Sequence, residues 1–554
     1  MYVDDSVIKT IRKRYSSLVN KKKNGWETLW RSVTDFIVPY SGKYTESKQN
    51  PLSRNHYIEN NCTRIASRVL RSGLYSGLLS KSSKWFRLST SRTELLENDD
   101  VKAWFYEVEK IIEQVLSKSN FYESMYNVLG DCADFGTSVT FISEDYDNVI
   151  RCYNMNIGEY CLANDSTLEP TTLYREITMT VGQIVERFGI ENVSESVKNS
   201  FENNNIDSER IIVHVIEPND DRIKISDLKK FVYRSIYYEK STNDSLVLEV
   251  SGYDELPFIV FRWDVRPDEV YGWGVGFDAV PDAKQLMLFE KESLYNLELV
   301  NRPPLVASSD FNNKRVTIQP STINIKNPNA MESGIAPIFN PMNALQSTSQ
   351  KISEIEQRIN ETYYTDLFRM LLNYGQSNMT ATEVNEKVAE KLQQLGSVVE
   401  RINGSLDLVF NRILPMCLRV GLLPEPPAIL QNQPIKVDYI SMLNQAQKAS
   451  EVNGINQFVS TIEAMASVNP YVIKMLNYDN IVKELAERYG VPAPIVKTDQ
   501  QIQEMEQAQA QQQQQQEQMQ QMQAYANGAK TLSQTNLDNN NVLGQLSQQM
   551  GNSG

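Results

Sequence analysis

The strongest pattern in this sequence is an amphipathic repeat between residues 380 and 423. Its apolar residues recur at alternating steps of four and three, which keeps them on one face of a helix. They are Val388, Leu392, Leu395, Val399, Ile402, Leu406, Val409 and Ile413. Thr380 and Glu383 have capping-box spacing, so their side chains can satisfy backbone amides at the helix start. We predict a rod on the order of 50 Å long that Pro415 ends or kinks.

A stripe of this kind is typical of a helix that packs on a core or on another helix, so we predict a packing role for it. The chain has 554 residues, enough for two or more domains. Its formal net charge of -14 argues against a protein whose main task is to grip phosphates, because Lys and Arg supply that grip. The charge does not exclude DNA that slides past.

The cysteines and the hydropathy pattern bear on the compartment. Five cysteines without CxxC spacing indicate a reducing compartment, and neither a disulfide framework nor a zinc site. The first residues show no apolar leader, and no apolar run approaches the roughly 18 residues of a membrane span. We therefore expect a protein that is cytosolic when synthesised and has no membrane partner.

Apolar periodicity changes along the first half of the chain. The first 140 residues have mainly helical spacing, and short β-type runs follow between about 137 and 263. A helix near 180–203 separates the two groups of β-type runs. The pattern predicts an α+β fold, predominantly helical, with a body of about 270 residues.

Two long helices are predicted on either side of an insert. The first runs from about Ala279 to Leu299, and some 40 residues rich in Pro, Asn and Ser follow it. A second helix begins beyond Pro341, with apolar residues in helical register. These are Ile352, Ile355, Ile359, Tyr363, Leu367 and Met370. A polar loop, residues 373–378, then leads into the long helix.

The C-terminal part contains weaker signals. Two helical stretches are expected at roughly 439–467 and 471–489. The Gln-rich tail from Asp499 has heptad spacing but a polar seam, so the sequence leaves helix and disorder equally open.

Few residues suggest chemistry. His56 and His214 stand in different segments without a Cys or acidic pair at ligand spacing, so both are interpreted as structural. Gly272, Gly274 and Gly276 form a turn, because the third spacing of a dinucleotide loop is wrong. The sequence contains no GxxxxGK[ST] phosphate loop and no GxSxG elbow. We predict no catalytic residue, no cofactor and no metal site.

Two pairs of adjacent acidic residues could in principle bind a magnesium ion. They are Asp99 with Asp100 and Asp220 with Asp221. Their positions are more typical of helix starts and turns.

The order of these segments and their amino-acid sequences resemble those of the portal, or head-to-tail connecting protein, of short-tailed bacteriophages of the T7 type (podoviruses). The resemblance covers nearly the whole chain. Six colinear stretches carry it: GWETLWRSVTDFIVPY at 25–40, SGLLSKSSKWFRL at 76–88, FYESMYNVLGDCADFGTSVTFI at 121–142, YGWGVGFDAVPDAKQL at 271–286, NRPPLV at 301–306 and NMTATEVNEKVAEKLQQLG at 378–396.

The resemblance implies a portal fold with named regions, assembled as a cyclic ring of twelve copies. The regions of one subunit are the wing at 1–277 with its β-rich part at about 137–263, stem helix 1 at 278–301, the clip at 302–342, stem helix 2 at 343–372, the channel loop at 373–379, a long wing helix at 380–423, the crown at 424–498, and a Gln-rich barrel helix or disordered tail at 499–554.

The resemblance also implies a function and partners. The ring would stand at one capsid vertex of the virion, assembled in the host cytoplasm, as the channel for DNA packaging and genome ejection. Terminase and later tail adaptor proteins would dock on it, and the major capsid and scaffolding proteins would surround it. Double-stranded DNA would pass through it.

Two sets of residues are candidates for contact with DNA. The uncharged loop residues are Asn373, Tyr374, Gln376, Ser377 and Asn378, which can touch a DNA backbone without holding it. An ordinary helix–helix turn is the alternative interpretation. The basic candidates for the channel or clip are Lys284, Lys291, Arg302, Lys314, Arg315 and Lys326. An equally weighted alternative is that these basic residues form ion pairs with acidic residues of neighbouring subunits.

Two other classes of protein remain as alternatives. A coiled-coil scaffolding or adaptor protein would explain the long helices but not the α+β body. A nuclease of the packaging apparatus would need clustered carboxylates, and the acidic residues are scattered.

Overall fold

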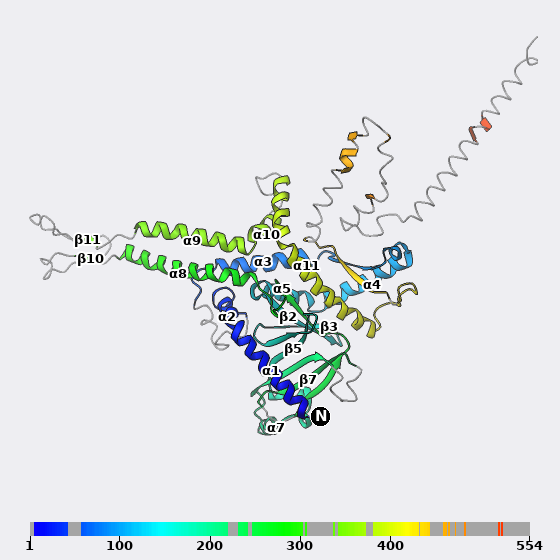
Figure 1. The fold of residues 1–554 in the computed structure, drawn as a ribbon, viewed down its shortest axis with the longest axis horizontal. Helices are drawn as coiled ribbons and strands as arrows, with labels where there is room; N and C mark the ends of the chain where they lie inside the picture. The colour runs from blue at the N-terminus through cyan, green and yellow to red at the C-terminus, as the bar shows by residue number, and fades with distance from the viewer. Residues whose placement is uncertain are drawn as a thin grey trace, which may run out of the picture. The chain divides into compact units, whose positions relative to one another are not determined.

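The computed structural model describes most of the chain up to residue 441 and short pieces beyond it (Figure 1). The described ranges are 5–41, 57–219, 231–241, 246–302, 305–306, 336–337, 342–372, 381–431 and 433–441, with 443, 458–462, 464–465, 471, 481–482, 519–520 and 522–523. The chain divides into two units, Met1–Glu463 and Ala464–Gly554. The architecture below is that of the first unit.

Helices dominate the N-terminal part, as the spacing predicts. They are α1 (Asp5–Gly25), α2 (Glu27–Phe36), α3 (Cys62–Leu78), the 3-10 segment η2 (Thr93–Glu97), α4 (Asp99–Lys118) and α5 (Phe121–Phe135). The side chain of Asn98 caps α4 by accepting a hydrogen bond from the Asp100 amide at 2.9 Å. Asp99 and Asp100 therefore form the acidic first turn of a helix, as interpreted from the sequence.

Two antiparallel sheets follow. The three-stranded sheet has the order β3 (Val149–Met155), β2 (Thr137–Asp145), β9 (Phe258–Arg262). The five-stranded sheet has the order β4 (Tyr160–Asn164), β5 (Pro170–Thr180), β6 (Glu209–Pro218), β7 (Tyr233–Glu239), β8 (Glu249–Tyr253). The α+β body is thus confirmed, and its strands fall in the range that the β-type runs predict.

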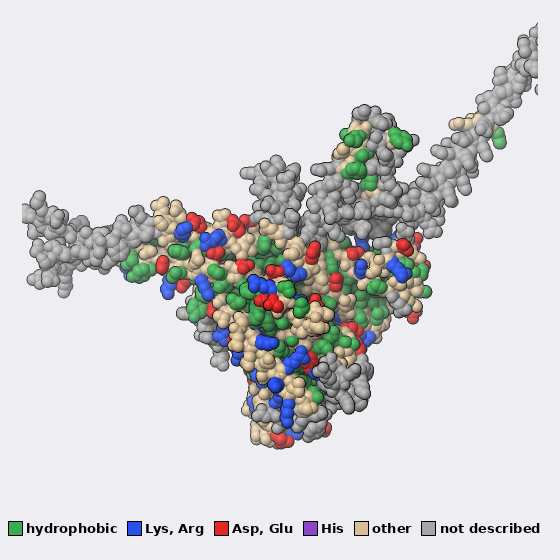
Figure 2. Space-filling model, viewed as in Figure 1, with side chains coloured by type: hydrophobic (Ala, Val, Ile, Leu, Met, Phe, Trp, Pro, Cys, Tyr) green, Lys and Arg blue, Asp and Glu red, His purple; other side chains and the backbone are tan. Residues whose placement is uncertain are grey.

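Helix α1 packs on one face of the five-stranded sheet. Its apolar side chains, Ile8 and Ile11 among them, join Val213 of β6 and Ile236 of β7 in one buried cluster. Val213 points to this face because side chains alternate along a strand. Lys and Arg side chains gather on the outer surface where α1 crosses the sheet (Figure 2).

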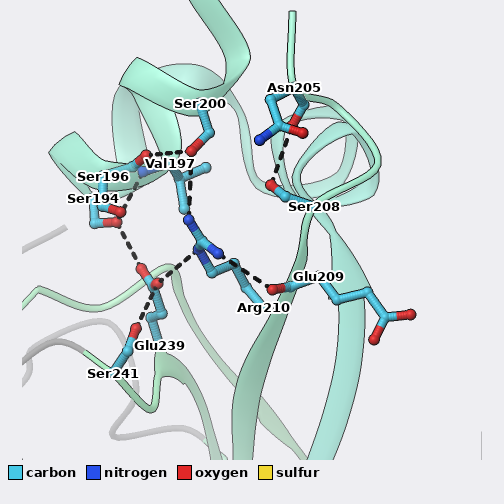
Figure 3. A network of polar contacts seen from close by, with 10 residues as sticks. All are labelled: Ser194, Ser196, Val197, Ser200, Asn205, Ser208, Glu209, Arg210, Glu239 and Ser241. Atoms are coloured by element: carbon cyan, nitrogen blue, oxygen red, sulfur yellow. Dashed lines mark hydrogen bonds and ion pairs between the residues drawn. The ribbon is translucent and has the colours of Figure 1, made fainter. Parts of the chain in front are cut away.

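The other face of this sheet carries two short helices, α6 (Val181–Phe188) and α7 (Glu195–Glu202), with η3 (Ile190–Asn192) between them. The single helix expected near 180–203 is therefore wrong, since Gly189, at φ +78, ends α6. Ser194 caps α7 and donates to Glu239 of β7 at 2.6 Å. Arg210 of β6 lies 3.9 Å from the same carboxylate and donates to Ser200 of α7 at 3.4 Å, so it adds a second link between α7 and the sheet (Figure 3).

The long helix that the sequence predicts exists as α11 (Ala381–Arg419). The part of its seam whose side chains are described is buried, and it packs mainly on β9. These residues are Leu395, Val399, Ile402, Leu406, Val409 and Ile413. The packing role is confirmed for them. Pro415 does not end the helix, which continues to Arg419. A proline removes one amide donor and one helical hydrogen bond, and the remaining bonds of this last turn continue past it.

A short antiparallel pair joins distant parts of the chain. Strand β1 (Phe86–Thr90) pairs with β12 (Ile435–Tyr439). The sequence interpretation placed no strand at 435–439. Trp85, beside β1, stacks on Tyr439 with ring centroids 6.3 Å apart, so an aromatic contact reinforces the pairing.

Candidate functional site

The most distinctive part of the fold is a pair of long helices. Helix α8 (Val275–Asn301) leads to β10 (Leu305–Val306), and α9 (Met342–Thr362) follows β11 (Ala336–Pro337). The two short strands pair antiparallel, and α8 and α9 lie side by side along their length (Figure 1). The chain therefore leaves the body along α8 and returns along α9, which we call the helix pair.

The two helices of the pair present different surfaces. The exposed face of α9 contains only polar and charged side chains among residues 346–361. Helix α8 exposes large apolar side chains, namely Leu288, Leu294, Tyr295 and Leu297. Several large apolar side chains exposed on one helix are typical of a surface that another protein covers.

One asparagine links both helices of the pair to α3. The side-chain amide nitrogen of Asn60 (Nδ2) donates to Glu290 of α8 at 2.6 Å and to Glu356 of α9 at 2.9 Å. Its side-chain oxygen accepts from the Cys62 amide at 2.7 Å, at the start of α3. On the opposite side of α9, Arg358 forms an ion pair of 2.7 Å with Asp282 of α8.

A buried acid anchors the base of the helix pair. Asp134, in the last turn of α5, is 1% exposed. Its carboxylate accepts hydrogen bonds from Tyr363 Oη at 3.0 Å and Ser67 Oγ at 2.7 Å. Burial raises the pKa of Asp134, while Arg71 and these two donors lower it. The bonds join α3 and α5 to the end of α9.

A second acid shares the same guanidinium. Arg71 Nη2 lies 3.7 Å from Asp131 and 3.9 Å from Asp134. Burial raises the pKa of Asp131 to about 6, although Arg71 and a hydrogen bond from Ser41 oppose the shift. Arg71 also lies against Gly130, where an added Cβ would come within 1.8 Å of Arg71 Nε. The cluster therefore holds two carboxylates against one cation in a site with little room.

The predicted second helix is interrupted at this anchor. Tyr364 adopts φ +53, a left-handed conformation, between α9 and α10 (Thr365–Leu372). The hydroxyl of Thr365 donates to the Asn360 carbonyl at 2.7 Å and so satisfies the end of α9. Ile355, Ile359, Tyr363 and Leu367 are nevertheless buried in the predicted register. The continuous helix over 343–372 was wrong because a single left-handed residue has no periodic signal.

The three glycines expected to form one turn allow close packing instead: Gly272 and Gly274 precede α8, and Gly276 lies in its first turn. A Cβ on Gly274 would lie 2.4 Å from the Gly136 amide nitrogen, and one on Gly276 would lie 2.1 Å from the Asp134 carbonyl oxygen. Only glycine allows the start of α8 to approach the end of α5 this closely.

The basic candidates fall in three places. Lys284 on α8 donates to Ser32 of α2 at 3.4 Å and lies 5.2 Å from the Phe36 ring centroid, so it contacts the body. Lys291 is exposed on α8, and Arg302 is exposed directly after it. Lys314, Arg315 and Lys326 lie outside the described residues, as do Thr380 and the loop residues Asn373, Tyr374, Gln376, Ser377 and Asn378. The roles of all these residues stay predictions.

The described residues contain no cluster of three or more His, Cys, Asp or Glu side chains that could hold a metal ion. His214 is fully buried, with Arg175 at 3.0 Å from Nδ1 and Ser235 at 2.9 Å from Nε2. Burial lowers its pKa well below the usual value, so the ring stays neutral in the sheet. His56, Asp220 and Asp221 lie outside the described residues. In the part of the chain that is described, no helix has the length and apolarity of a membrane span.

Sequence reasoning missed the residues that anchor the helix pair. Tyr363 and Asp134 are 229 residues apart in the sequence. Tyr363 was assigned only to an apolar stripe. The one available signal was an acid in the apolar context of FYESMYNVLGDCADF, since a buried acid requires a partner.

The family follows from comparison with known proteins. The model of the family described as bacteriophage head to tail connecting protein matches residues 8–496, so the chain belongs to that family. The chain is 32% identical over 537 residues to the "Portal protein" of Salmonella phage epsilon15, covering 96% of both chains. It is 29% identical over 498 residues to the "Probable portal protein" of Bordetella phage BPP-1, covering 89% of both. The family resemblance predicted from the sequence is confirmed.

Solved structures show a looser likeness. A chain of "Virion of native gene transfer agent (GTA) particle" matches at 10% identity with a TM-score of 0.35, covering 74% of this chain and 88% of that one. A chain of "Neck of empty GTA particle computed with C6 symmetry" matches at 11% identity with a TM-score of 0.36, covering 78% and 95%.

Proposed function

We propose that this chain is a portal protein, of which identical copies form a ring at one vertex of a bacteriophage capsid. The family match over residues 8–496 is the observation that carries the proposal. The ring would form the channel for DNA packaging and for genome ejection. The resemblance implies twelve copies.

The helix pair would be the stem of this ring. A cyclic ring uses heterologous interfaces, in which one surface of each subunit meets a different surface of the next. The exposed apolar side chains of α8 and the polar face of α9 are two such different surfaces. Packing of α8 on the neighbouring subunit would bury these apolar side chains and leave polar side chains of α9 to face solvent or DNA.

The remaining regions keep the roles that the resemblance implies. Residues 1–277 with the long helix at 380–423 would be the wing, 302–342 the clip, 424–498 the crown, and 499–554 the barrel helix or tail. The clip would face terminase during packaging and tail adaptor proteins afterwards. The wing would face the major capsid and scaffolding proteins, in a particle assembled in the host cytoplasm.

The channel loop, residues 373–379, would touch the passing DNA. It joins α10 to α11, and α10 follows the anchored corner at Tyr363. Uncharged polar side chains can hydrogen bond to a phosphate backbone without the salt-dependent affinity of Lys and Arg. Deletion of residues 374–378 should leave rings intact and impair DNA packaging or retention, and wild-type packaging after the deletion would reject this role.

Electron microscopy of the purified protein tests the proposal as a whole. Hollow rings are expected. Monomers would reject a portal, and rods would favour the coiled-coil scaffolding alternative. We propose a structural protein and no enzyme; nuclease activity that disappears on substitution of Asp99 and Asp100 by Asn would instead support the nuclease alternative.

A further inference from the structure

Helix α1 concentrates positive charge in an acidic chain. Residues 6–25 contain seven basic residues and no Asp or Glu, while the whole chain has a formal net charge of -14. For comparison, α4 has nearly the same length but contains five acids and three lysines. A solvated helix usually mixes both signs, as α4 does.

Three of the basic residues of α1 act within the protein. Arg14 forms an ion pair of 2.8 Å with the buried Glu217 of β6. Lys22 donates to the carbonyl oxygens of Gly158 at 2.8 Å and Tyr160 at 3.1 Å. The guanidinium of Arg12 lies 5.0 Å from the centroid of the Tyr238 ring. These contacts orient the helix on the five-stranded sheet and fix which side faces outward.

The other four basic residues face solvent. Lys9, Lys13, Lys21 and Lys23 are exposed, and no described residue forms an ion pair or a hydrogen bond with their side-chain nitrogens. Ser17, Asn20 and Asn24 are exposed between them. The four lysines, which we call the lysine face, span about 21 Å of helix at ~1.5 Å per residue. Figure 2 shows basic side chains over this part of the surface.

We propose that the lysine face is a sequence-independent binding surface for the backbone of double-stranded DNA, on the outside of the body and separate from the channel. Lysine is a point charge suited to phosphates, and Ser and Asn side chains commonly contact the same backbone. DNA carries one negative charge per ~1.7 Å of its axis, so a duplex that lies along α1 has a phosphate within reach of each of the four lysines. A protein partner fits less well, because protein interfaces have an apolar core and α1 exposes no large apolar side chain.

The inference rests on the proposed function in one respect: a portal protein operates in the presence of double-stranded DNA. The test uses the full-length protein and covalently closed circular duplex DNA, which cannot thread through a closed ring. Binding is measured by gel shift and sedimentation from 50 to 200 mM monovalent salt. Four phosphate contacts predict an apparent affinity that falls about 100-fold over this range. Ring formation is scored separately by electron microscopy.

The decisive variant replaces Lys9, Lys13, Lys21 and Lys23 with Gln. It should bind circular DNA at least about 10-fold more weakly at 50 mM salt and lose most of the salt dependence. The matched control replaces Lys102, Lys110, Lys118 and Lys436 with Gln, which removes the same charge elsewhere, and should bind as the wild type does. Circular dichroism melting should show that both variants fold.

Several outcomes would overturn the inference. They are absence of binding by the wild type, unchanged binding by the lysine-face variant, and equal loss in the control. Binding of polyglutamate in place of DNA, abolished by the same variant, would assign the face to an acidic protein instead. Rings that do not bind circular DNA would reject this inference alone, whereas DNA binding without rings would reject the proposed function and leave the lysine face standing.

Discussion

Tyr363, at the end of α9, donates a hydrogen bond of 3.0 Å to the fully buried carboxylate of Asp134 in α5. The bond fixes the corner at which the chain turns from α9 into α10, where Tyr364 holds a left-handed conformation. This buried polar contact therefore helps to orient the end of α9, and the segment that leads toward the proposed channel loop, on the body.

Removal of the Tyr363 hydroxyl tests this anchor. Tyr363→Phe leaves the buried Asp134 carboxyl short of one hydrogen-bond donor, which should lower the free energy of unfolding by about 1 to 3 kcal/mol. Chemical denaturation at one protein concentration measures the change. Tyr75→Phe is the control, since no described residue hydrogen bonds to its hydroxyl, and it should shift stability by less than about 0.5 kcal/mol. Equal effects of the two substitutions would contradict an anchoring role.

The raised pKa of Asp131 predicts a pH dependence. Its pKa of about 6 in the folded protein lies above the ordinary value of about 3.9, so the folded state binds the extra proton. The stability that this proton contributes is complete below pH ~4 and is lost as the pH rises through 6. Relative to Asp131→Asn, the wild type should therefore become more stable by up to about 3 kcal/mol as the pH falls from 8 to 4.

Denaturation of both proteins across this pH range checks the sign. The difference between wild type and variant cancels the titration of groups that do not interact with Asp131; Asp134, which shares Arg71 with it, is not among them. A difference that does not change with pH would show that Asp131 titrates normally.

The close approach of α8 to α5 gives a steric prediction. Gly276→Ala places a Cβ 2.1 Å from the Asp134 carbonyl oxygen, which is backbone and cannot move aside, so we expect a loss of about 2 kcal/mol or more. Gly404→Ala is the matched control in α11, because nothing lies within 4 Å of the added Cβ. This control should be stabilising by about 0.5 to 1 kcal/mol through helix propensity. Thermal unfolding of the two variants should shift in opposite directions.

What the sequence could predict depends on the range of the interaction. The seam of α11 was predictable because its apolar spacing is a property of one helix, and its described residues from Leu395 to Ile413 are buried. The pairing of β1 with β12 was not, although Ile435, Val437 and Tyr439 alternate with polar residues, because five residues are too few to identify a strand and its partner is far away in the sequence.

The anchor of the helix pair lay beyond sequence reasoning for a further reason. The anchoring role of Asp134 depends on its contacts with Tyr363, Ser67 and Arg71. These residues come from distant parts of the sequence, and no sequence spacing predicts that they meet. The candidate DNA contacts were chosen by charge and by resemblance. Among them, Lys284 contacts α2, which charge alone could not indicate.

Asn60 offers a test of how the two helices of the pair are held together. Asn60→Asp keeps the shape of the side chain but replaces the amide donor, which bonds to Glu290 and Glu356, with a third carboxylate. Three neighbouring carboxylates repel one another, and one of them must protonate or move away. We expect a loss of about 1 to 3 kcal/mol in stability and faster hydrogen exchange in α8 and α9, measured by mass spectrometry. Asn61→Asp is the charge-matched control: Asn61 is the N-cap of α3, where Asp is favourable, so exchange in α8 and α9 should not change. Unchanged exchange in the Asn60 variant as well would mean that the apolar contacts between α8 and α9, and not the bridge through Asn60, hold the pair together.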